Sequence, residues 1–201
     1  MILETSVIEK RKNFSRNNLG QRKESDFYET PYSMTAQLLE SENFDTSAAT
    51  LEPAYGGGAI VKVLIKKGFS KVYVGDISEG DDFLIQKNKF SQIITNPPYR
   101  LALEFVLKAK ELTERKFAFL LPTDYIHGLD RFEKIFCDSK FPLSRILTFV
   151  RRPMLGDALR PDGKYRTGMQ TYSWFIWDRL HDGPATIGWL NNQEFVLKAG
   201  E

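Results

Sequence analysis

The chain has 201 residues, which is enough for one well-buried domain and does not by itself require two. Its 42% hydrophobic and 27% charged residues are ordinary for a globular protein, and a formal net charge of +2 is too small to establish a polyanionic partner. The single cysteine, Cys137, excludes an internal disulfide and fits a reducing compartment. No apolar run reaches membrane-spanning length and residues 1–14 lack the apolar core of a signal peptide, so we expect a cytoplasmic protein.

The first 26 residues differ in composition from the rest of the chain. They are polar, and their basic side chains are Lys10, Arg11, Lys12, Arg16, Arg22 and Lys23. Such a segment is either a loosely attached tail or a basic arm that contacts phosphate, and its composition leaves both interpretations open. We therefore expect a basic flexible arm over residues 1–26 and one folded domain over residues 27–201.

Two segments in the first third of the chain have the pattern of loops that lead into helices. Thr30 and Pro31 stand before a helical run that contains Met34, and threonine as a cap with proline in the first turn is a common helix start. Further on, a short strand that ends at Glu52 leads into the glycine-rich turn 56–58. Glycines let the backbone turn sharply and approach a ligand, and ligands of open parallel sheets bind at the carboxyl ends of the strands.

The most informative stretch is an apolar run, residues 90–95, that leads directly into Asn-Pro-Pro-Tyr at 96–99. The run predicts a buried strand, and the two prolines end it because proline has a fixed φ and no N–H. Asn96 and Pro97 both precede a proline and therefore favour extended conformations. The result is a stiff loop at a strand tip that presents a side-chain amide, main-chain carbonyl groups and an aromatic ring.

This set of groups suits a flat heterocycle that carries an amino group. The Asn96 side-chain oxygen and the Pro97 carbonyl can accept the two amino hydrogens, while Tyr99 stacks on the ring. Methylation of an exocyclic amine such as adenine N6 requires such a grip, because the nitrogen lone pair is delocalised into the ring. Two acceptors favour a pyramidal nitrogen and stabilise the developing positive charge, so no strong general base is required. A proline-rich turn without function is the competing interpretation of the tetrapeptide alone.

The remainder of the chain alternates predicted helices and strands. We expect helices over 101–112 and around 132–136, strands over 117–122, 143–150 and 171–177, a basic loop over 155–170 and a peripheral segment beyond residue 183. This alternation predicts a doubly wound α/β sheet. Cys137 falls at the second helix, where we expect it to be buried, and we expect Trp174 and Trp177 to pack in the core.

The chain resembles the N6-adenine DNA methyltransferases, which use S-adenosylmethionine. Asn-Pro-Pro-Tyr at 96–99 is the signature of amino methyltransferases, and Glu-Pro-x-x-Gly-x-Gly at 52–58 resembles their motif I. Thr-Pro at 30–31 resembles motif X, Asp-Phe-Leu at 82–84 resembles motif III, and the order of these segments is that of the gamma class. The stretch 168–177 resembles the closing pattern of phage-type members. The resemblance covers roughly residues 28–177.

The resemblance implies a Rossmann-like methyltransferase fold, α/β, with a mostly parallel sheet and an antiparallel hairpin at its end. Only Ile77–Asp81 separates the acid at the second strand tip, Asp76, from Asp82. A helical crossover between parallel strands needs about a dozen residues or more. We therefore expect that the helix between strands two and three is missing, that strand three is short or absent, and that the cofactor's adenine pocket is more open on that side.

The resemblance also implies roles for individual residues. Asn96, Pro97, Pro98 and Tyr99 form the catalytic loop, Asp76 binds the ribose hydroxyls and Asp82 contacts the adenine amino group of the cofactor. The residues expected to hold S-adenosylmethionine are Tyr28, Thr30, Pro31, Glu52, Pro53, Ala54, Gly56, Gly58, Asp76, Ile77, Asp82, Phe83 and Asn96. Those expected to contact nucleic-acid phosphates are Arg152, Arg160, Lys164 and Arg166. Asp81 is expected to be a solvated acid, and no His/Cys cluster predicts a metal.

The expected activity is transfer of a methyl group from S-adenosylmethionine to the N6 amino group of adenine in DNA. A stacked adenine must be flipped out of a duplex, and few residues follow the last predicted strand. We therefore expect weak sequence specificity, a single-stranded or locally opened substrate, or a partner subunit that supplies recognition, and no membrane. Three alternatives stay open: adenine in RNA, a glutamine side chain of a protein, and a non-catalytic cofactor-binding subunit.

Overall fold

The computed structural model of the chain describes residues 29–156 and 168–192. The expected arm over residues 1–26, together with Tyr28, Arg160, Lys164 and Arg166, lies outside these ranges. The helices and strands are α2 (Tyr32–Ser41), β1 (Thr50–Glu52), α3 (Ala59–Lys66), β2 (Val72–Val74), β3 (Phe90–Thr95), α4 (Ala102–Leu112), β4 (Thr113–Pro122), α5 (Leu129–Arg131), β5 (Leu143–Phe149), β6 (Tyr172–Asp178) and β7 (Thr186–Leu190). None of the helices in these ranges is long and apolar enough to cross a membrane.

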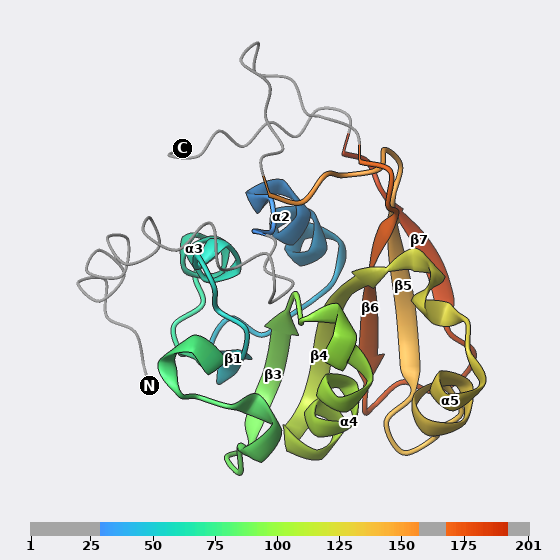
Figure 1. Ribbon diagram of the computed structural model, residues 1–201, viewed down its shortest axis with the longest axis horizontal. Helices are drawn as coiled ribbons and strands as arrows, with labels where there is room; N and C mark the ends of the chain where they lie inside the picture. Colours follow the sequence, from blue (N-terminus) through green and yellow to red (C-terminus); the bar gives the residue numbers. More distant parts are fainter. Residues whose placement is uncertain (1–28, 157–167, 193–201) are drawn as a thin grey trace.

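The strands form one seven-stranded sheet in the order β2-β1-β3-β4-β6-β5-β7 (Figure 1). Strands β1 to β4 are parallel, and β6 is inserted antiparallel between β4 and β5. The predicted α/β class, the mostly parallel sheet and the antiparallel hairpin near its end are therefore confirmed. Because β1, β2 and β3 run in one direction, the loops that follow them meet at one edge of the sheet.

Each face of the sheet is covered by its own set of helices (Figure 1). Helices α2 and α3 cover one face, and α4 with the helical turn Phe132–Phe136 covers the other. Successive side chains of strand β6 point to opposite faces of the sheet, so this strand contributes to the hydrophobic core on each face. Trp174 faces α2, and its indole N–H donates to the Met34 carbonyl at 3.0 Å. Trp177 lies on the opposite face and stacks on Phe117. The prediction that both tryptophans pack in the core is confirmed.

The connection between β2 and β3 carries no strand and no long helix. It contains two short 3₁₀ turns, Ile77–Glu79 and Phe83–Ile85, and β2 is left as an edge strand. The predicted loss of a crossover helix after Asp76 is confirmed, and the short strand that would follow such a helix near Asp82 is absent from this fully described stretch, so the next strand along the chain is β3 at residues 90–95. As a consequence, no further strand of the described ranges pairs with β2, and Ile77 in the loop that follows β2 is 70% exposed.

Three local features differ from the sequence-based expectation. Strand β4 begins at Thr113, before the expected residue 117, because the buried Lys116 is neutralised in place by Glu42 (Nζ to Oε1, 2.5 Å). Cys137 is exposed rather than buried, because Ile135 takes the inward position of that turn. Beyond residue 183 the chain adds β7 beside β5, a strand that hydrophobic alternation did not reveal. Most of the side chains of β7 are exposed, and Leu190 is its one buried residue.

Candidate active site

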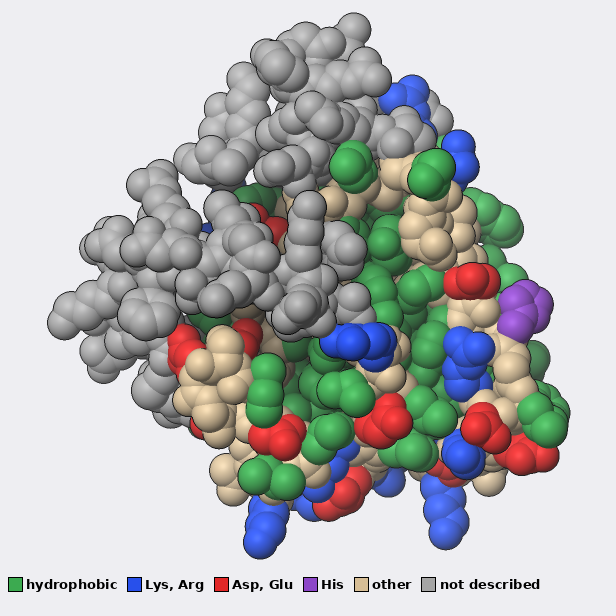
Figure 2. All heavy atoms as spheres, in the orientation of Figure 1, with side chains coloured by type: hydrophobic (Ala, Val, Ile, Leu, Met, Phe, Trp, Pro, Cys, Tyr) green, Lys and Arg blue, Asp and Glu red, His purple; other side chains and the backbone are tan. Residues whose placement is uncertain are grey.

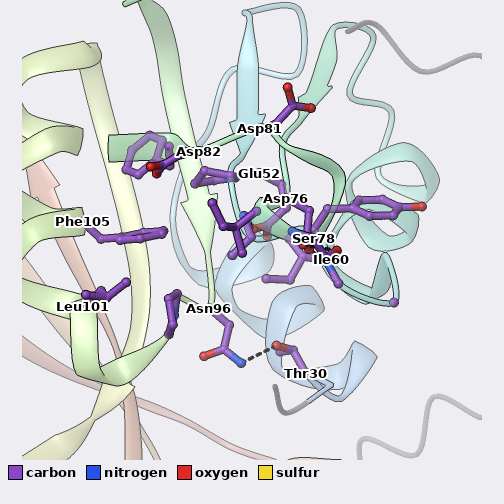
Figure 3. A pocket seen from close by; sticks show the side chains of 18 of the residues that line it. Thr30, Glu52, Ile60, Asp76, Ser78, Asp81, Asp82, Asn96, Leu101 and Phe105 are labelled. Carbon is purple, nitrogen blue, oxygen red and sulfur yellow. Dashed lines mark hydrogen bonds between the residues drawn. The ribbon is translucent and has the colours of Figure 1, made fainter. Parts of the chain in front are cut away.

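A cavity with a volume of about 310 Å³ lies where β1, β2 and β3 end (Figure 3). Its walls come from the glycine-rich loop after β1, the loop after β2 and the Asn-Pro-Pro-Tyr loop after β3, with Glu29 and Thr30 on the side of α2. Segments far apart in the sequence are thus gathered at the carboxyl edge of the parallel strands, where open α/β sheets bind ligands.

Most of the residues expected to hold a cofactor line this cavity. They are Thr30, Glu52, Pro53, Ala54, Gly56, Asp76, Ile77, Asp82, Phe83 and Asn96, and Pro98 of the Asn-Pro-Pro-Tyr loop joins them. Pro31, Gly58, Pro97 and Tyr99 do not line it, and Tyr28 lies outside the described residues. Ten lining residues were not expected: Glu29, Tyr55, Gly57, Ala59, Ile60, Ser78, Asp81, Leu84, Leu101 and Phe105. Leu101 and Phe105 are one helical turn apart, a spacing that in a sequence indicates core packing rather than a ligand wall.

The glycine-rich loop is held in place by the tip of the neighbouring strand. The Gly56 amide donates to Asp76 Oδ2 at 2.7 Å, and Gly56 and Gly58 both have positive φ values, 49° and 76°. A Cβ at Gly58 would lie 2.8 Å from the Tyr55 hydroxyl oxygen, so glycine is required there to seat the Tyr55 ring at the start of α3. Gly56 therefore shapes the cavity wall, whereas Gly58 supports it from behind.

Asp76 and Asp82 are both oriented by the backbone that follows them. Asp76 Oδ1 accepts from the Ser78 amide at 2.9 Å and from the Ser78 hydroxyl at 2.5 Å. Since a carboxylate offers about four acceptor positions, Asp76 retains capacity for one further donor beyond Gly56 and Ser78. Asp82 Oδ1 accepts from the Leu84 amide at 2.9 Å, and the adjacent Phe83 ring packs on Phe105 at 4.9 Å. The two acids thus flank an apolar wall. Asp81 is exposed, and its carboxylate points away from the other labelled side chains in Figure 3.

Glu52 is the buried acid of the site. Its side chain lies on the cavity wall but is only 1% exposed, and Oε1 accepts from the Ala54 amide at 2.9 Å and the Thr95 hydroxyl at 2.5 Å. Burial raises the pKa of Glu52 to about 8, against the lowering effect of these two hydrogen bonds. Oε2 is buried and has no hydrogen-bond partner in the described part of the chain. When the carboxyl group ionises, the natural complement of this oxygen is a ligand group that donates a hydrogen bond or carries positive charge.

Asn96 lies opposite the acids, and its amide is held by a residue from the start of the fold. Asn96 Nδ2 donates to Thr30 Oγ1 at 3.0 Å, the contact drawn as a dashed line in Figure 3. Thr30 is 4% exposed, and Pro97, next to Asn96, is also buried. The Asn96 amide and the acids after β1 and β2 therefore line the same cavity.

Tyr99 occupies a different environment from the one expected of a base-stacking residue. It is half-buried, and its ring lies against Tyr172 with centroids 5.9 Å apart and planes inclined by 32°. Rings at this separation are in direct contact. Tyr172 begins β6, and the sequence predicted it only as part of a strand, so its place beside the Asn-Pro-Pro-Tyr loop could not be expected from the sequence.

The groups expected to contact phosphate are mostly outside the described ranges. Arg152 follows β5 and is exposed, whereas Arg160, Lys164 and Arg166 lie in the segment that the structure does not describe. On the face shown in Figure 2, the basic and acidic side chains of the described residues are interspersed rather than gathered in one patch. Within the described ranges, no group of three or more His, Cys, Asp or Glu side chains could hold a metal ion.

The fold has many counterparts among solved structures, although no protein-family model and no curated protein matches the sequence. A protein from Listeria monocytogenes, proposed to be a class I S-adenosylmethionine-dependent methyltransferase, superposes with a TM-score of 0.57 at 15% identity, over 81% of this chain and 65% of that one. The modification subunit of a proposed type I restriction enzyme from Vibrio vulnificus gives 0.54 at 14%, over 90% and 49%.

A third counterpart, a proposed RNA methyltransferase from Pyrococcus horikoshii, gives a TM-score of 0.51 at 17% identity, over 89% of this chain and 100% of that one. The chain therefore spans less than two thirds of the Listeria protein and about half of the Vibrio subunit. At these identities the likeness is one of fold. The chain has the Rossmann-like fold of class I S-adenosylmethionine-dependent methyltransferases.

Proposed function

We propose that this protein binds S-adenosylmethionine in the cavity and transfers its methyl group to the N6 amino group of adenine in DNA. The observation that carries the proposal is that one cavity joins the Asn96 amide to Glu52, Asp76 and Asp82. The side chain proposed to bind the target amine and the acids proposed to bind the positively charged cofactor thus line the same cavity. The cofactor, when bound, supplies an electrophilic methyl group on a sulfonium centre.

The lining residues fit the parts of this cofactor. Asp76 has acceptor capacity for a ribose hydroxyl, and the wall formed by Phe83, Leu101 and Phe105 is apolar and suits a purine ring. Asp82 lies beside that wall and can accept from an exocyclic amino group. The buried Oε2 of Glu52 suits the ammonium group at the methionine end, because a cation in contact with this carboxyl group lowers its raised pKa and favours the ionised form.

The chain's own contribution to methyl transfer is to grip and orient the amine. The Asn96 side-chain oxygen and the Pro97 carbonyl accept the two amino hydrogens of the target base. These contacts draw electron density onto the nitrogen and stabilise the positive charge that develops on it. Because the two acceptor groups are already in place, the protein does not have to rearrange during the reaction. The amino proton is then released from a cationic nitrogen and needs no strong base.

Target binding requires a rearrangement beside the catalytic loop. A stacked adenine is out of reach in a duplex and must be flipped, and the Tyr99 ring is engaged with Tyr172 in this structure. We infer that the flipped base stacks on Tyr99 as the contact with Tyr172 opens. Arg152, Arg160, Lys164 and Arg166 are proposed to contact the phosphates, which positions the strand without reading its sequence.

Adenine in RNA is the second candidate substrate, and one observation favours it. The superposition covers the whole of the proposed RNA methyltransferase from Pyrococcus horikoshii, but only 49% of the modification subunit from Vibrio vulnificus. About half of the modification subunit therefore lies outside the superposition. The catalytic loop would act on the N6 amino group in the same way in either nucleic acid.

The test is a methyl-transfer assay with radiolabelled S-adenosylmethionine on duplex DNA, single-stranded DNA, RNA and protein extract, followed by nucleoside analysis. The proposal expects N6-methyladenine in DNA, with more label in single-stranded or locally opened DNA than in duplex. Label confined to RNA would replace DNA by the second candidate. Label in protein, or none at all with cofactor bound, would contradict both.

A further inference from the structure

We propose that Thr30 is a positioning residue that holds the Asn96 amide in place, with its Nδ2 edge on the side of α2. The inference rests on the proposed function, in which Asn96 grips the target amine. It starts from a contact between residues 66 positions apart: Asn96 Nδ2 donates to Thr30 Oγ1 at 3.0 Å at the wall of the cavity (Figure 3). The segment before α2 thereby becomes part of the catalytic machinery as well as of the cofactor wall.

Thr30 does not do what its place in the sequence suggests. A threonine before a proline-led helix is a typical N-cap, but the N-cap of α2 is Pro31, and no side chain makes a capping hydrogen bond there. The Thr30 hydroxyl accepts from Asn96 instead. With the residue 4% exposed, its hydroxyl serves a contact inside the protein rather than solvation.

The backbone on both sides of Thr30 is fixed. The Glu29 carbonyl accepts from the Gly156 amide at 2.8 Å, and the Pro31 carbonyl accepts from the Met34 amide at 3.0 Å in the first turn of α2. Asn96 is equally restricted, because it ends a buried strand and precedes proline. Two side chains on rigid supports therefore meet, which is the arrangement that keeps a catalytic group in one geometry.

The edge of the amide that faces the amine matters because the two edges have opposite polarity. The oxygen accepts hydrogen bonds, whereas the NH₂ group only donates. A target amino group also donates, so an NH₂ edge turned toward it would place donor against donor. Nδ2 lies on the side of α2, and the contact with Thr30 keeps the amide in this orientation, with its oxygen edge toward the substrate. Its contribution should appear in the rate of methyl transfer and not in the affinity for cofactor.

The test compares Thr30→Val, which keeps the shape and removes the hydroxyl, with Thr30→Ser, which keeps the hydroxyl. The matched control is Thr35→Val, since Thr35 is a fully buried threonine of α2 that does not line the cavity and whose hydroxyl has no hydrogen-bond partner among the described residues. Thr30→Val should lower kcat about tenfold, the effect of one net hydrogen bond, with the cofactor Kd changed less than twofold. Thr30→Ser and Thr35→Val should stay within about twofold of the unaltered protein in both quantities.

Two results would overturn the inference. An unchanged kcat in Thr30→Val would show that the amide needs no such support. A weaker cofactor Kd with an unchanged kcat at saturating cofactor would show that Thr30 is a wall of the cofactor site only. Thr30→Ala, which places no methyl group against the amide, gives the same readouts if thermal melting shows that valine disturbs the fold.

A second readout does not depend on activity. In the ¹⁵N spectrum of the protein without substrate, the Asn96 side-chain NH₂ signals, identified by their loss in Asn96→Ala, should lose their protection from hydrogen exchange in Thr30→Val. Protection that persists would overturn the positioning role even if methyl transfer to adenine is confirmed. Lost protection in a protein that methylates no adenine would support the contact and refute the proposed function, so the two failures are distinguishable.

Discussion

Glu52 and Thr95 join the ends of two neighbouring strands: the Thr95 hydroxyl, directly before Asn96 in the chain, donates to Glu52 Oε1 at 2.5 Å. The bond places a buried carboxyl group beside the backbone that carries Asn96. Burial raises the pKa of this carboxyl to about 8, and the nearby charge of Asp76 acts in the same direction. The site is therefore sensitive to the protonation of Glu52 and to any cation that reaches it.

The raised pKa of Glu52 predicts how stability changes with pH. The folded protein keeps the Glu52 proton up to about pH 8, whereas the unfolded chain loses it near its ordinary pKa of 4.5. Between these values the unfolded chain binds fewer protons, so the free energy of unfolding should fall as pH rises from 4.5 to about 8. Glu52→Gln should remove this fall. Urea denaturation of both proteins across the range measures it, and parallel curves would show that Glu52 is ionised in the folded state.

Asp76 is predicted to govern cofactor affinity. Asp76→Ala removes an acceptor for the ribose and the tether of the Gly56 amide, so the Kd for S-adenosylmethionine should rise about ten- to a hundredfold, as expected for hydrogen bonds to a charged group. Isothermal titration calorimetry measures the change. Asp130→Asn, at an exposed acid of α5 remote from the cavity, is the control. Equal affinity in Asp76→Ala and the control would remove Asp76 from the cofactor site.

Lys116 is predicted to be a major stabilising residue of the sheet. Its ammonium group lies 2.5 Å from Glu42 Oε1 and 3.5 Å from Asp178 Oδ2, with little solvent access. Lys116→Met removes the buried cation but leaves Arg145 beside Glu42 and Arg115 beside Asp178, so it should lower the free energy of unfolding by about 2 kcal/mol, as expected for lost hydrogen bonds of a charged group.

The control for Lys116 is Lys134→Met, which breaks an exposed pair with Asp130 at 3.6 Å and should cost less than about 1 kcal/mol. Chemical denaturation of the two variants gives the comparison. Similar losses in both would mean that the buried position of Lys116 adds nothing.

Tyr99 is predicted to bind the target base rather than the cofactor. Tyr99→Ala should reduce kcat/KM for the nucleic acid about ten- to a hundredfold, the range for loss of one stacked base, while the cofactor Kd stays unchanged because Tyr99 does not line the cavity. Tyr99→Phe keeps the ring and should be nearly fully active. Steady-state kinetics with varied nucleic acid gives both values. If phenylalanine is as impaired as alanine, the hydroxyl and not the ring is the functional group.

The sequence predicted the fold where short-range chemistry decides, and most of the residues expected to hold a cofactor line one cavity. Residues 90–95 form a strand that stops at the prolines, and the short spacing between Asp76 and Asp82 does exclude a crossover helix. The exposed strand β7 and the wall formed by Leu101 and Phe105 could not be predicted, since apolar spacing does not distinguish core from cavity. Nor could the contact of Thr30 with Asn96, because it depends on how α2 docks on the sheet.

The most direct measurement is single-turnover methyl transfer from radiolabelled S-adenosylmethionine to adenine-containing single-stranded DNA, with Asn96→Ala compared with the unaltered protein. Removing one preorganised polar contact predicts N6-methyladenine formed about a hundred- to a thousandfold more slowly by the variant, while its cofactor Kd stays nearly the same. Equal rates in the two proteins, or label on an atom other than N6, would contradict the assignment of Asn96 as the residue that grips the target amine.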